Sequence, residues 1–328
     1  MFKPIGEQGQ KKIVSSSAVL IGCGALGSNI AQLLVRAGVG KLKICDRDYV
    51  ELENLQRQTL FDEDDVKENL PKAVAAREKL AKINSEVRVE VVVSDVNFEN
   101  VEELIKGATL VLDGTDNFET RFLLNDACVK HNIPWIYGGA VSSYGMVAVI
   151  LPNKTPCFRC LVGELPEAGS SPTCDTVGVL NSIVGVISSI QSGEAIKFIS
   201  GNADALIDGV ATIDLWQNSF RIFKAERDHN CKTCVLRDFE FLTTSPSHFT
   251  KLCGRNAVQI ATKNRAQIDF AALSNKLNSL GKVSCNDFLL KFYIDGYELT
   301  IFKDARAIIK GTDDITKAKS LYAKYIGV

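Results

Sequence analysis

A glycine-rich loop between a short apolar strand and an amphipathic helix constrains this chain more than any other feature. Residues Gly22–Gly27 follow the pattern G-x-G-x-x-G, with the β-rich run Ala18–Ile21 before them and apolar residues at helical spacing over Ala25–Ala37. Glycines in such a loop let backbone N–H groups approach a phosphate at the N-terminus of a helix. The loop predicts a nucleotide-binding α/β domain.

An acidic residue at the end of the next predicted strand supports this interpretation. Asp46 follows the run Leu42–Cys45, where a carboxylate accepts hydrogen bonds from ribose hydroxyls. The loop and Asp46 together indicate a nucleotide without saying which one, and NAD-dependent dehydrogenases carry the same pair. A glycine turn that binds no ligand is the alternative without a function.

Strands and helices alternate along the first part of the chain. Further strands are predicted over Val87–Val93, Thr109–Leu112 and Trp135–Tyr137, and helices over Pro71–Ile83, Val101–Ile105, Phe118–His131 and Val179–Ile199. Such alternation predicts an α/β fold with a Rossmann-like, mostly parallel sheet and helices on both faces. Gly145–Leu151 has no crossover helix of its own and Ala211–Lys224 reads as a hairpin, so the sheet should continue into an antiparallel part.

The pattern changes after Cys234. Residues 152–176 are rich in Pro, Gly, Ser and Cys and are expected to form a loop, and Thr243–His248 has the composition of a linker. We expect a nucleotide-binding domain over 1–242, a linker over 243–252 and a small α+β module over 253–328, whose role the sequence does not indicate. In that module a turn at Asp295–Gly296 joins two strands.

Composition excludes several classes of partner. The formal net charge of −1 gives no concentrated positive field for nucleic acid or an anionic membrane. Gly, Ser, Asn or Pro interrupts every long uncharged stretch, so no membrane span is expected. The N-terminus lacks the apolar run of a secretion signal, so the cytoplasm is the expected compartment. Cysteines are then expected to be free, and Cys23, Cys45 and Cys128 to pack as small apolar side chains.

Basic residues beyond the glycine loop favour a triphosphate over NAD. Asn54–Gln58 includes Arg57, and Lys72 follows on the next predicted helix. Three phosphates carry more negative charge than two, and Arg57 offers a bidentate cation while Lys72 offers a point charge. The alternative is that both are ordinary solvated surface charges.

Two polar residues follow the fourth predicted strand. Asp116 beside a polyphosphate would be repelled unless a divalent cation lay between them, which makes it a candidate Mg²⁺ ligand. The alternative role for Asp116 or Asn117 is to cap the helix that begins near Phe118. We expect Asn117 to be the cap.

Two CxxC pairs suggest a metal. Four thiolates satisfy tetrahedral Zn²⁺ and leave no position for substrate, so the cysteines Cys157, Cys160, Cys231 and Cys234 predict a structural zinc site. The alternative is a redox CxxC, which usually lies at the start of a helix near a βαβ unit, and the presence of two pairs favours zinc.

Taken in order, these motifs make the chain resemble the ThiF/MoeB-type activating enzymes, which are related to ubiquitin-activating enzymes. The resemblance runs from about Ile5 to about Cys234 and is closest to the molybdopterin-synthase type. It rests on Ile5–Gln10, the glycine loop, Asp46, Asn54–Gln58, Lys72, Thr115–Asn117, the two CxxC pairs and Cys174–Gly178.

The resemblance implies a homodimer that binds Mg²⁺ and ATP and receives the Gly-Gly tail of a ubiquitin-like sulfur-carrier protein. The carrier carboxylate would attack the α-phosphate and give an acyl-adenylate and pyrophosphate, in molybdopterin or thiamine biosynthesis. The implied nucleotide-site residues are Gly22, Gly24, Ala25, Gly27, Asp46, Asn54, Gln56, Arg57, Lys72, Asp116 and Asn117. Sulfur would come from a separate donor protein, because the 253–328 module shows no sulfurtransferase-like loop.

Cys174 neither packs in an apolar run nor belongs to a CxxC pair. A cysteine in a loop is compatible with a nucleophile that takes the activated acyl group or forms a persulfide adduct. The resemblance places a cysteine here, so Cys174 joins Arg57, Lys72 and Asp116 as a candidate catalytic residue. An incidental loop cysteine is the alternative.

The sequence departs from its relatives in two places. Ala25 stands where they carry Gly, and its N–H remains usable if φ is negative. The Arg-Tyr-x-Arg-Gln stretch that usually precedes the Ile5 region is missing before Met1, so we expect either a shortened start or an enzyme that works without that arginine. An NAD-dependent oxidoreductase and a non-catalytic carrier-binding scaffold remain as alternative functions.

Overall fold

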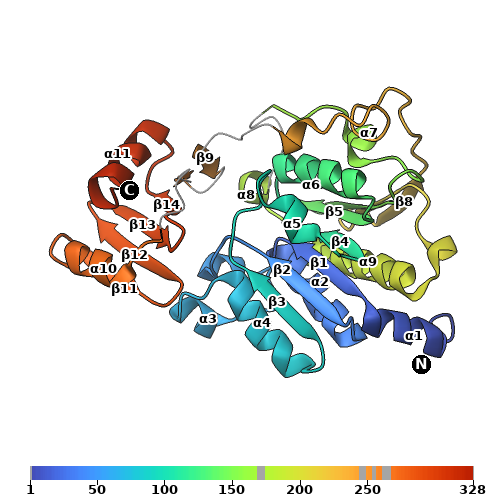
Figure 1. Cartoon of the computed structure of the whole chain (residues 1–328), viewed down its shortest axis with the longest axis horizontal. Helices are drawn as coiled ribbons and strands as arrows, with labels where there is room; N and C mark the ends of the chain where they lie inside the picture. The colour runs from blue at the N-terminus through green and yellow to red at the C-terminus, as the bar shows by residue number, and fades with distance from the viewer. Residues whose placement is uncertain (1, 168–173, 244–248, 253–255, 261–266, 328) are drawn as a thin grey trace. The chain divides into compact units, whose positions relative to one another are not determined.

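The computed structural model describes residues 2–167, 174–243, 249–252, 256–260 and 267–327 (Figure 1). The chain divides into two compact units, Met1–Thr244 and Ser245–Val328. The first unit contains an eight-stranded sheet with the strand order β3-β2-β1-β4-β5-β6-β7-β8. Among the described residues, no helix combines the length and apolar character that a membrane crossing requires.

The parallel half of this sheet is the predicted α/β alternation. Its strands are β1 (Ser17–Ile21), β2 (Lys41–Cys45), β3 (Arg88–Val92), β4 (Leu110–Asp113) and β5 (Trp135–Val141), and the connecting helices include α2 (Ala25–Ala37), α4 (Lys72–Ile83), α5 (Val101–Ile105) and α6 (Phe118–His131). All pairings from β3 through β5 are parallel. Every residue of β4 is buried, because helices cover both faces of a central parallel strand.

The antiparallel continuation is also confirmed. β6 (Tyr144–Ile150) runs antiparallel to β5, followed by β7 (Val210–Asp214) and the edge strand β8 (Ser219–Phe223). The predicted hairpin over Ala211–Lys224 is formed by β7 and β8, and Asn218 takes a positive φ of 52° in the turn between them.

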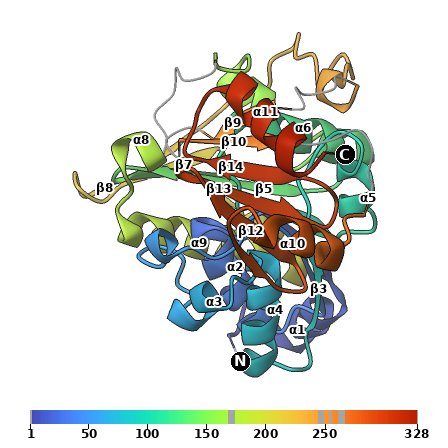
Figure 2. The same ribbon diagram turned by 90° about the vertical axis from the view of Figure 1, so that its left-hand side faces the viewer.

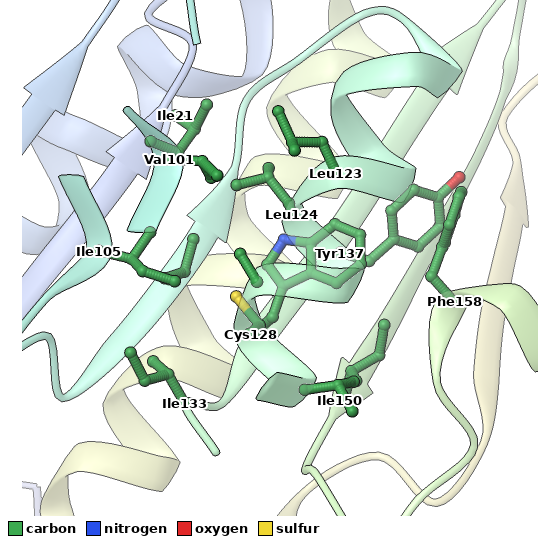
Figure 3. Close-up of a cluster of buried hydrophobic side chains, with 14 of the residues drawn as sticks. Ile21, Val101, Ile105, Leu123, Leu124, Cys128, Ile133, Tyr137, Ile150 and Phe158 are labelled. Carbon is green, nitrogen blue, oxygen red and sulfur yellow. The ribbon is translucent and has the colours of Figure 1, made fainter. Parts of the chain in front are cut away.

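Helices cover the two faces of the sheet. On one face α9 (Asn181–Ser200) packs against α1 (Gly6–Ser15), α2, β5 and β6. On the other face α5 and α6 close a core that includes Ile21, Leu124, Tyr137 and Phe158 (Figure 3). Burial of these apolar side chains fixes α6, and therefore the loop that precedes it, on the sheet.

The prediction that residues 152–176 form a loop was partly wrong. It contains α7 (Phe158–Val162) and most of α8 (Cys174–Val177). Helix α7 forms because Phe158 is fully buried against aromatic rings of the core and its N–H donates to Asn125 Oδ1 at 2.8 Å. The remaining short elements of this unit are η1 (Leu52–Asn54), α3 (Glu63–Lys67), η2 (Ala203–Ala205) and η3 (Glu240–Leu242).

The second unit is an antiparallel sheet with two helices on one face (Figure 2). Its strands lie in the order β11-β12-β13-β14-β10-β9. The elements are β9 (Phe249–Leu252), β10 (Ala257–Ile260), α10 (Phe270–Asn278), β11 (Lys282–Cys285), β12 (Leu289–Ile294), β13 (Tyr297–Phe302), β14 (Ala307–Lys310) and α11 (Ile315–Tyr325). The expected linker over 243–252 therefore needs a correction, because Phe249–Leu252 pairs with β10 and satisfies its edge hydrogen bonds.

Candidate functional site

The glycines of the loop have different structural roles. A Cβ on Gly22, whose φ is +87°, would lie 2.6 Å from Gly114 O, and one on Gly27 would lie 2.0 Å from Gly22 O. Both positions therefore require glycine for close backbone packing. A Cβ on Gly24 would meet only Gln58 Nε2, at 3.9 Å. Gly24 thus borders open space, as a glycine that faces a ligand should.

Helix α2 begins directly after this loop, with Ala25 as its first residue and Gly24 as its N-cap. No side chain among the described residues caps it. Uncapped N–H groups and the helix dipole favour an anion at this position. Ala25 can supply its backbone N–H without a side chain in the way.

Asp46 is tied to the glycine loop. Its Oδ2 accepts a hydrogen bond from Cys23 N at 2.6 Å, and its Oδ1 accepts one from Asp48 N at 2.7 Å. Burial raises the pKa of Asp46, and the nearby charge of Lys72 acts in the opposite direction. The carboxylate is therefore fixed in place beside the loop, where a ribose would be bound.

Two amide side chains near the loop have buried polar atoms without partners. Asn54 is fully buried, and within the described part of the chain neither its Oδ1 nor its Nδ2 has a hydrogen-bond partner. Gln58 is 3% exposed, and its Oε1 also has no hydrogen-bond partner among the described residues. Buried amides without partners are rare in folded proteins, so a polar ligand such as a nucleotide fits here.

The other residues of this segment lie nearer the surface. Gln56 is exposed, and Arg57 is half-buried with its Nη1 donating to Glu53 O at 3.1 Å. Gln58 was quoted in the sequence motif but not predicted as a site residue. A polar residue in a polar segment gave no sign that it would be buried beside Gly24.

Lys72 is not a solvated surface charge. It opens α4, is 3% exposed, and its Nζ lies 3.3 Å from Asp48 Oδ2. A buried ammonium requires anionic partners, and a bound phosphate can be one of them. Asp48 was not predicted, because nothing in the local sequence links it to Lys72.

Asp116 is exposed at the end of a rigid loop. Before it, the buried Asp113 forms an ion pair with Arg121, with Nε 3.1 Å from Oδ2, and Nη2 of Arg121 donates to Thr115 O at 2.7 Å. Burial raises the pKa of Asp113, and Arg121 opposes that shift. After Asp116, the side chain of Asn117 accepts from Thr120 N at 2.8 Å, which confirms the predicted helix cap.

Arg121 and Asp113 were missed as site residues. The available signal was an arginine within the apolar stretch that becomes α6, since a buried guanidinium requires an acidic partner. Arg121 also lies over the rings of Phe118 and Tyr137. These contacts hold the loop so that Asp116 projects into solvent at the carboxyl edge of β4.

The four cysteines of the CxxC pairs meet in space. All four Sγ atoms lie within 4.8 Å of one another, and three of the pairs are 3.5, 3.6 and 3.8 Å apart. Zn–S bonds of about 2.3 Å in a tetrahedron imply S–S distances of about 3.8 Å. The set therefore fits Zn²⁺. Asn125 Nδ2 lies 3.7 Å from Cys157 Sγ and Arg227 Nε lies 3.4 Å from Cys234 Sγ, where each can donate to a thiolate.

The cysteines Cys23, Cys45, Cys128 and Cys174 lie outside this cluster. Cys23, Cys45 and Cys128 are buried in the core, and burial raises the pKa of Cys23 and Cys128. Cys174 opens α8, but its side chain lies outside the described part of the structure.

The nucleotide-site residues converge on the carboxyl edge of β1, β2 and β4. Gly22 N donates to Cys45 O at 2.8 Å, and Gly114 N donates to Ile21 O at 2.7 Å, so the three strand ends are neighbours. A helix N-terminus, a ribose-type acceptor, a buried lysine and an exposed carboxylate surround this edge. The arrangement suits a polyphosphate nucleotide with a divalent cation.

Known proteins resemble the chain in sequence and in fold. The ThiF family matches residues 1–233. The chain is 44% identical over 331 residues to the sulfur carrier protein ThiS adenylyltransferase of Bacillus subtilis, which covers 100% of this chain and 97% of that protein. It is 37% identical over 230 residues to the SAMP-activating enzyme E1 of Haloferax volcanii, covering 70% of this chain and 84% of that one. The crystal structure of E. coli MccB with ATP shares the fold, with a TM-score of 0.61 at 24% identity over 69% of each chain.

Proposed function

Because this chain belongs to the ThiF family, we propose that it adenylylates the C-terminal glycine carboxylate of a ubiquitin-like sulfur-carrier protein. The observation that carries the proposal is a meeting of four residues at one sheet edge. They are an open Gly24, a fixed Asp46, the buried Lys72 and the buried Asn54, whose amide has no hydrogen-bond partner among the described residues. A dehydrogenase would use the loop and Asp46 but has no need of a buried phosphate-binding lysine.

The reaction is a displacement at phosphorus. A carboxylate oxygen of the carrier forms a bond to the α-phosphorus of ATP, the bond from that phosphorus to the bridging oxygen breaks, and pyrophosphate leaves with the electron pair. No general base is needed, because a carboxylate is already an anion at pH 7. Catalysis then consists of positioning and charge neutralisation.

Each residue has a role in that chemistry. Asp46 accepts from the ribose hydroxyls, Asn54 and Arg57 donate to phosphate oxygens, and Lys72 places a positive charge beside them. Gln56 and Asn117 border the same site. Asp116 would hold Mg²⁺, which neutralises part of the polyphosphate charge when bound.

The cysteines take two separate roles in the proposal. Cys157, Cys160, Cys231 and Cys234 would hold a structural Zn²⁺. Cys174 would act after adenylation, when its thiolate takes the acyl group and AMP leaves. Cys174→Ala should then keep pyrophosphate exchange but lose transfer, and loss of neither activity would leave it an incidental cysteine.

The carrier is proposed from the full-length relative. The resemblance in sequence was expected to be closest to the molybdopterin type, whereas a relative that matches the whole chain is named for ThiS. We therefore propose a ThiS-type carrier with a Gly-Gly tail, in thiamine biosynthesis. A homodimer and a separate sulfur donor protein complete the proposal, and sedimentation of the purified protein tests the first of these.

Exchange of labelled pyrophosphate into ATP tests the proposed function. We expect exchange to require a carrier with an intact C-terminal glycine and to be fastest with the ThiS type. If none of the candidate carriers supports exchange and the protein binds NAD, the result would support an oxidoreductase instead. Carrier binding without exchange would indicate a scaffold.

A further inference from the structure

We propose that Asp48 is a positioning residue that holds the ammonium of Lys72 away from Asp46, and so keeps the ribose-binding carboxylate free for the nucleotide. This inference rests on the proposed function only in that the site must bind ATP. It assigns a role to a residue that the nucleotide itself need not touch.

The backbone around Asp48 is rigid. The segment that leaves β2 is joined to the start of α4 by two hydrogen bonds, from Lys72 N to Asp48 O and from Val50 N to Leu70 O, both at 2.9 Å. Tyr49 and Pro71 form an isolated β-bridge between them. These contacts hold the backbones of Asp48 and Lys72 next to each other.

The carboxylate of Asp48 lies between two cations. Its Oδ2 is 3.3 Å from Lys72 Nζ, and its Oδ1 is 3.9 Å from Arg47 Nε. Arg47 is held from its other side by Asp95, with Nη1 2.8 Å from Oδ1. Since Arg47 has this second partner, Asp48 can direct one oxygen to Lys72.

Asp46 and Asp48 compete for the same ammonium. Lys72 lies near enough to Asp46 to act against the burial that raises the pKa of that carboxyl. A buried ammonium moves toward an available anion. If Asp48 loses its charge, Asp46 is the carboxylate toward which Lys72 is drawn.

That shift would damage two nucleotide contacts at once. An ion pair between Lys72 and Asp46 occupies the oxygen that accepts from the ribose, and it draws the ammonium from the phosphates. A general loss of structure would weaken ATP and its analogues alike. The specific consequence of the proposed role is a loss of ribose selectivity.

Calorimetric titration of the full chain with ATP and with 2′,3′-dideoxy-ATP separates these effects. Hydrogen bonds to a charged acceptor give the wild type a preference for ATP of about tenfold or more. Asp48→Asn is expected to reduce this preference to within about twofold and to weaken ATP by about tenfold. Asp64→Asn is the matched control, because Asp64 forms an exposed ion pair with Lys67, and it should keep wild-type values.

A second substitution tests the cause. In Asp48→Asn with Lys72→Met no ammonium is left to reach Asp46, so ribose preference should return although ATP affinity stays low. The proposal would be overturned if the double variant did not regain the preference for ATP over 2′,3′-dideoxy-ATP. It would also be overturned if Asp48→Asn alone kept the wild-type preference. If Asp48→Asn does not fold, Asp48→Glu replaces it: its carboxylate still pairs with Lys72, and loss of ribose preference there would contradict the role.

The two proposals fail in different ways. A wild-type protein that binds no ATP refutes the nucleotide site and with it the proposed function. A wild-type protein that prefers ATP, beside an Asp48→Asn variant that prefers it equally, refutes only the role of Asp48.

Discussion

The hydroxyl of Thr233 donates a hydrogen bond to Oδ1 of Asp126 at 2.8 Å, which joins α6 to the loop between the last two cysteines of the four-cysteine cluster. The preceding residue, Asn125, accepts from Phe158 N beside the first two cysteines. Helix α6 is therefore tied to both CxxC pairs. Its N-terminus follows Asp116, so the cysteine cluster and the candidate Mg²⁺ ligand share one rigid element.

The first prediction concerns zinc. We expect one Zn²⁺ per chain in protein purified without chelator, and none in Cys231→Ser. The variant should lose on the order of 5 kcal/mol or more of unfolding free energy, because metal binding to such a cluster contributes directly to folding. Metal analysis checks the zinc content, and thermal melting checks the loss of stability. Wild-type protein that contains no metal and is as stable as Cys231→Ser would contradict the prediction.

Asp126 should make stability depend on pH in an unusual direction. Burial raises the pKa of Asp126 to about 6, whereas an unfolded Asp titrates near 3.9. Between about pH 4 and pH 6 the folded state holds a proton that the unfolded state has released, so this group lowers the unfolding free energy as pH rises, by up to roughly 3 kcal/mol at pH 7.

The Asp126→Asn variant isolates this effect. Its unfolding free energy minus that of the wild type should increase between pH 4 and pH 6 and stay constant above pH 7. Asn keeps only one of the two acceptor oxygens that serve Thr233 and Phe241, and this loss adds a constant offset. Urea unfolding at several pH values measures the difference, and a difference that does not change with pH would refute the shifted pKa.

Two glycine substitutions should separate packing from nucleotide binding. Gly24→Ala places a methyl group in open space, and we expect an unchanged melting temperature with ATP affinity lowered about tenfold or more, because the methyl group intrudes where phosphate approaches. Gly27→Ala forces a contact with Gly22 O and should lower stability by a few kcal/mol. Equal loss of stability in both variants would show that Gly24 also serves packing.

Asp116→Ala should abolish adenylation and leave the fold intact. The side chain is exposed, so its removal creates no cavity, while loss of a Mg²⁺ ligand should slow pyrophosphate exchange roughly a thousandfold or more. Glu119→Ala, an exposed acid in the first turn of α6, is the matched control and should exchange normally. Near-normal exchange in folded Asp116→Ala would remove Asp116 from the metal site.

Sequence predicted the elements whose ends carry strong local signals. Helix α2 matches its expected bounds and ends at Gly38, which has a φ of +80°, and α6 matches between its Asn117 cap and Asn132, which has a φ of +55°. Helix α1 was missed because it buries only Gly9 and Ile13, too few for a periodic pattern. The four-residue strands β9, β10, β11 and β14 were missed, because runs this short show little periodicity in the sequence.

The site followed the same division. Gly22–Gly27, Asp46 and the cysteine pairs were visible because each follows a recognisable pattern along the chain. Asp48 was not visible, because its partner Lys72 meets it only after the sheet and helices have formed. Arg121 could be suspected from its place in the stretch that becomes α6, but its pairing with Asp113 could not be read from the sequence. Ion pairs between distant segments depend on tertiary structure and leave no local pattern.

The most direct test of the account is the mass of a ThiS-type carrier after incubation with this protein, ATP and Mg²⁺. The account predicts a carrier heavier by one AMP, with the adduct on its C-terminal glycine, formed together with pyrophosphate and absent when that glycine is deleted. A carrier of unchanged mass in a reaction that consumes no ATP, tested across the candidate carriers, would contradict it.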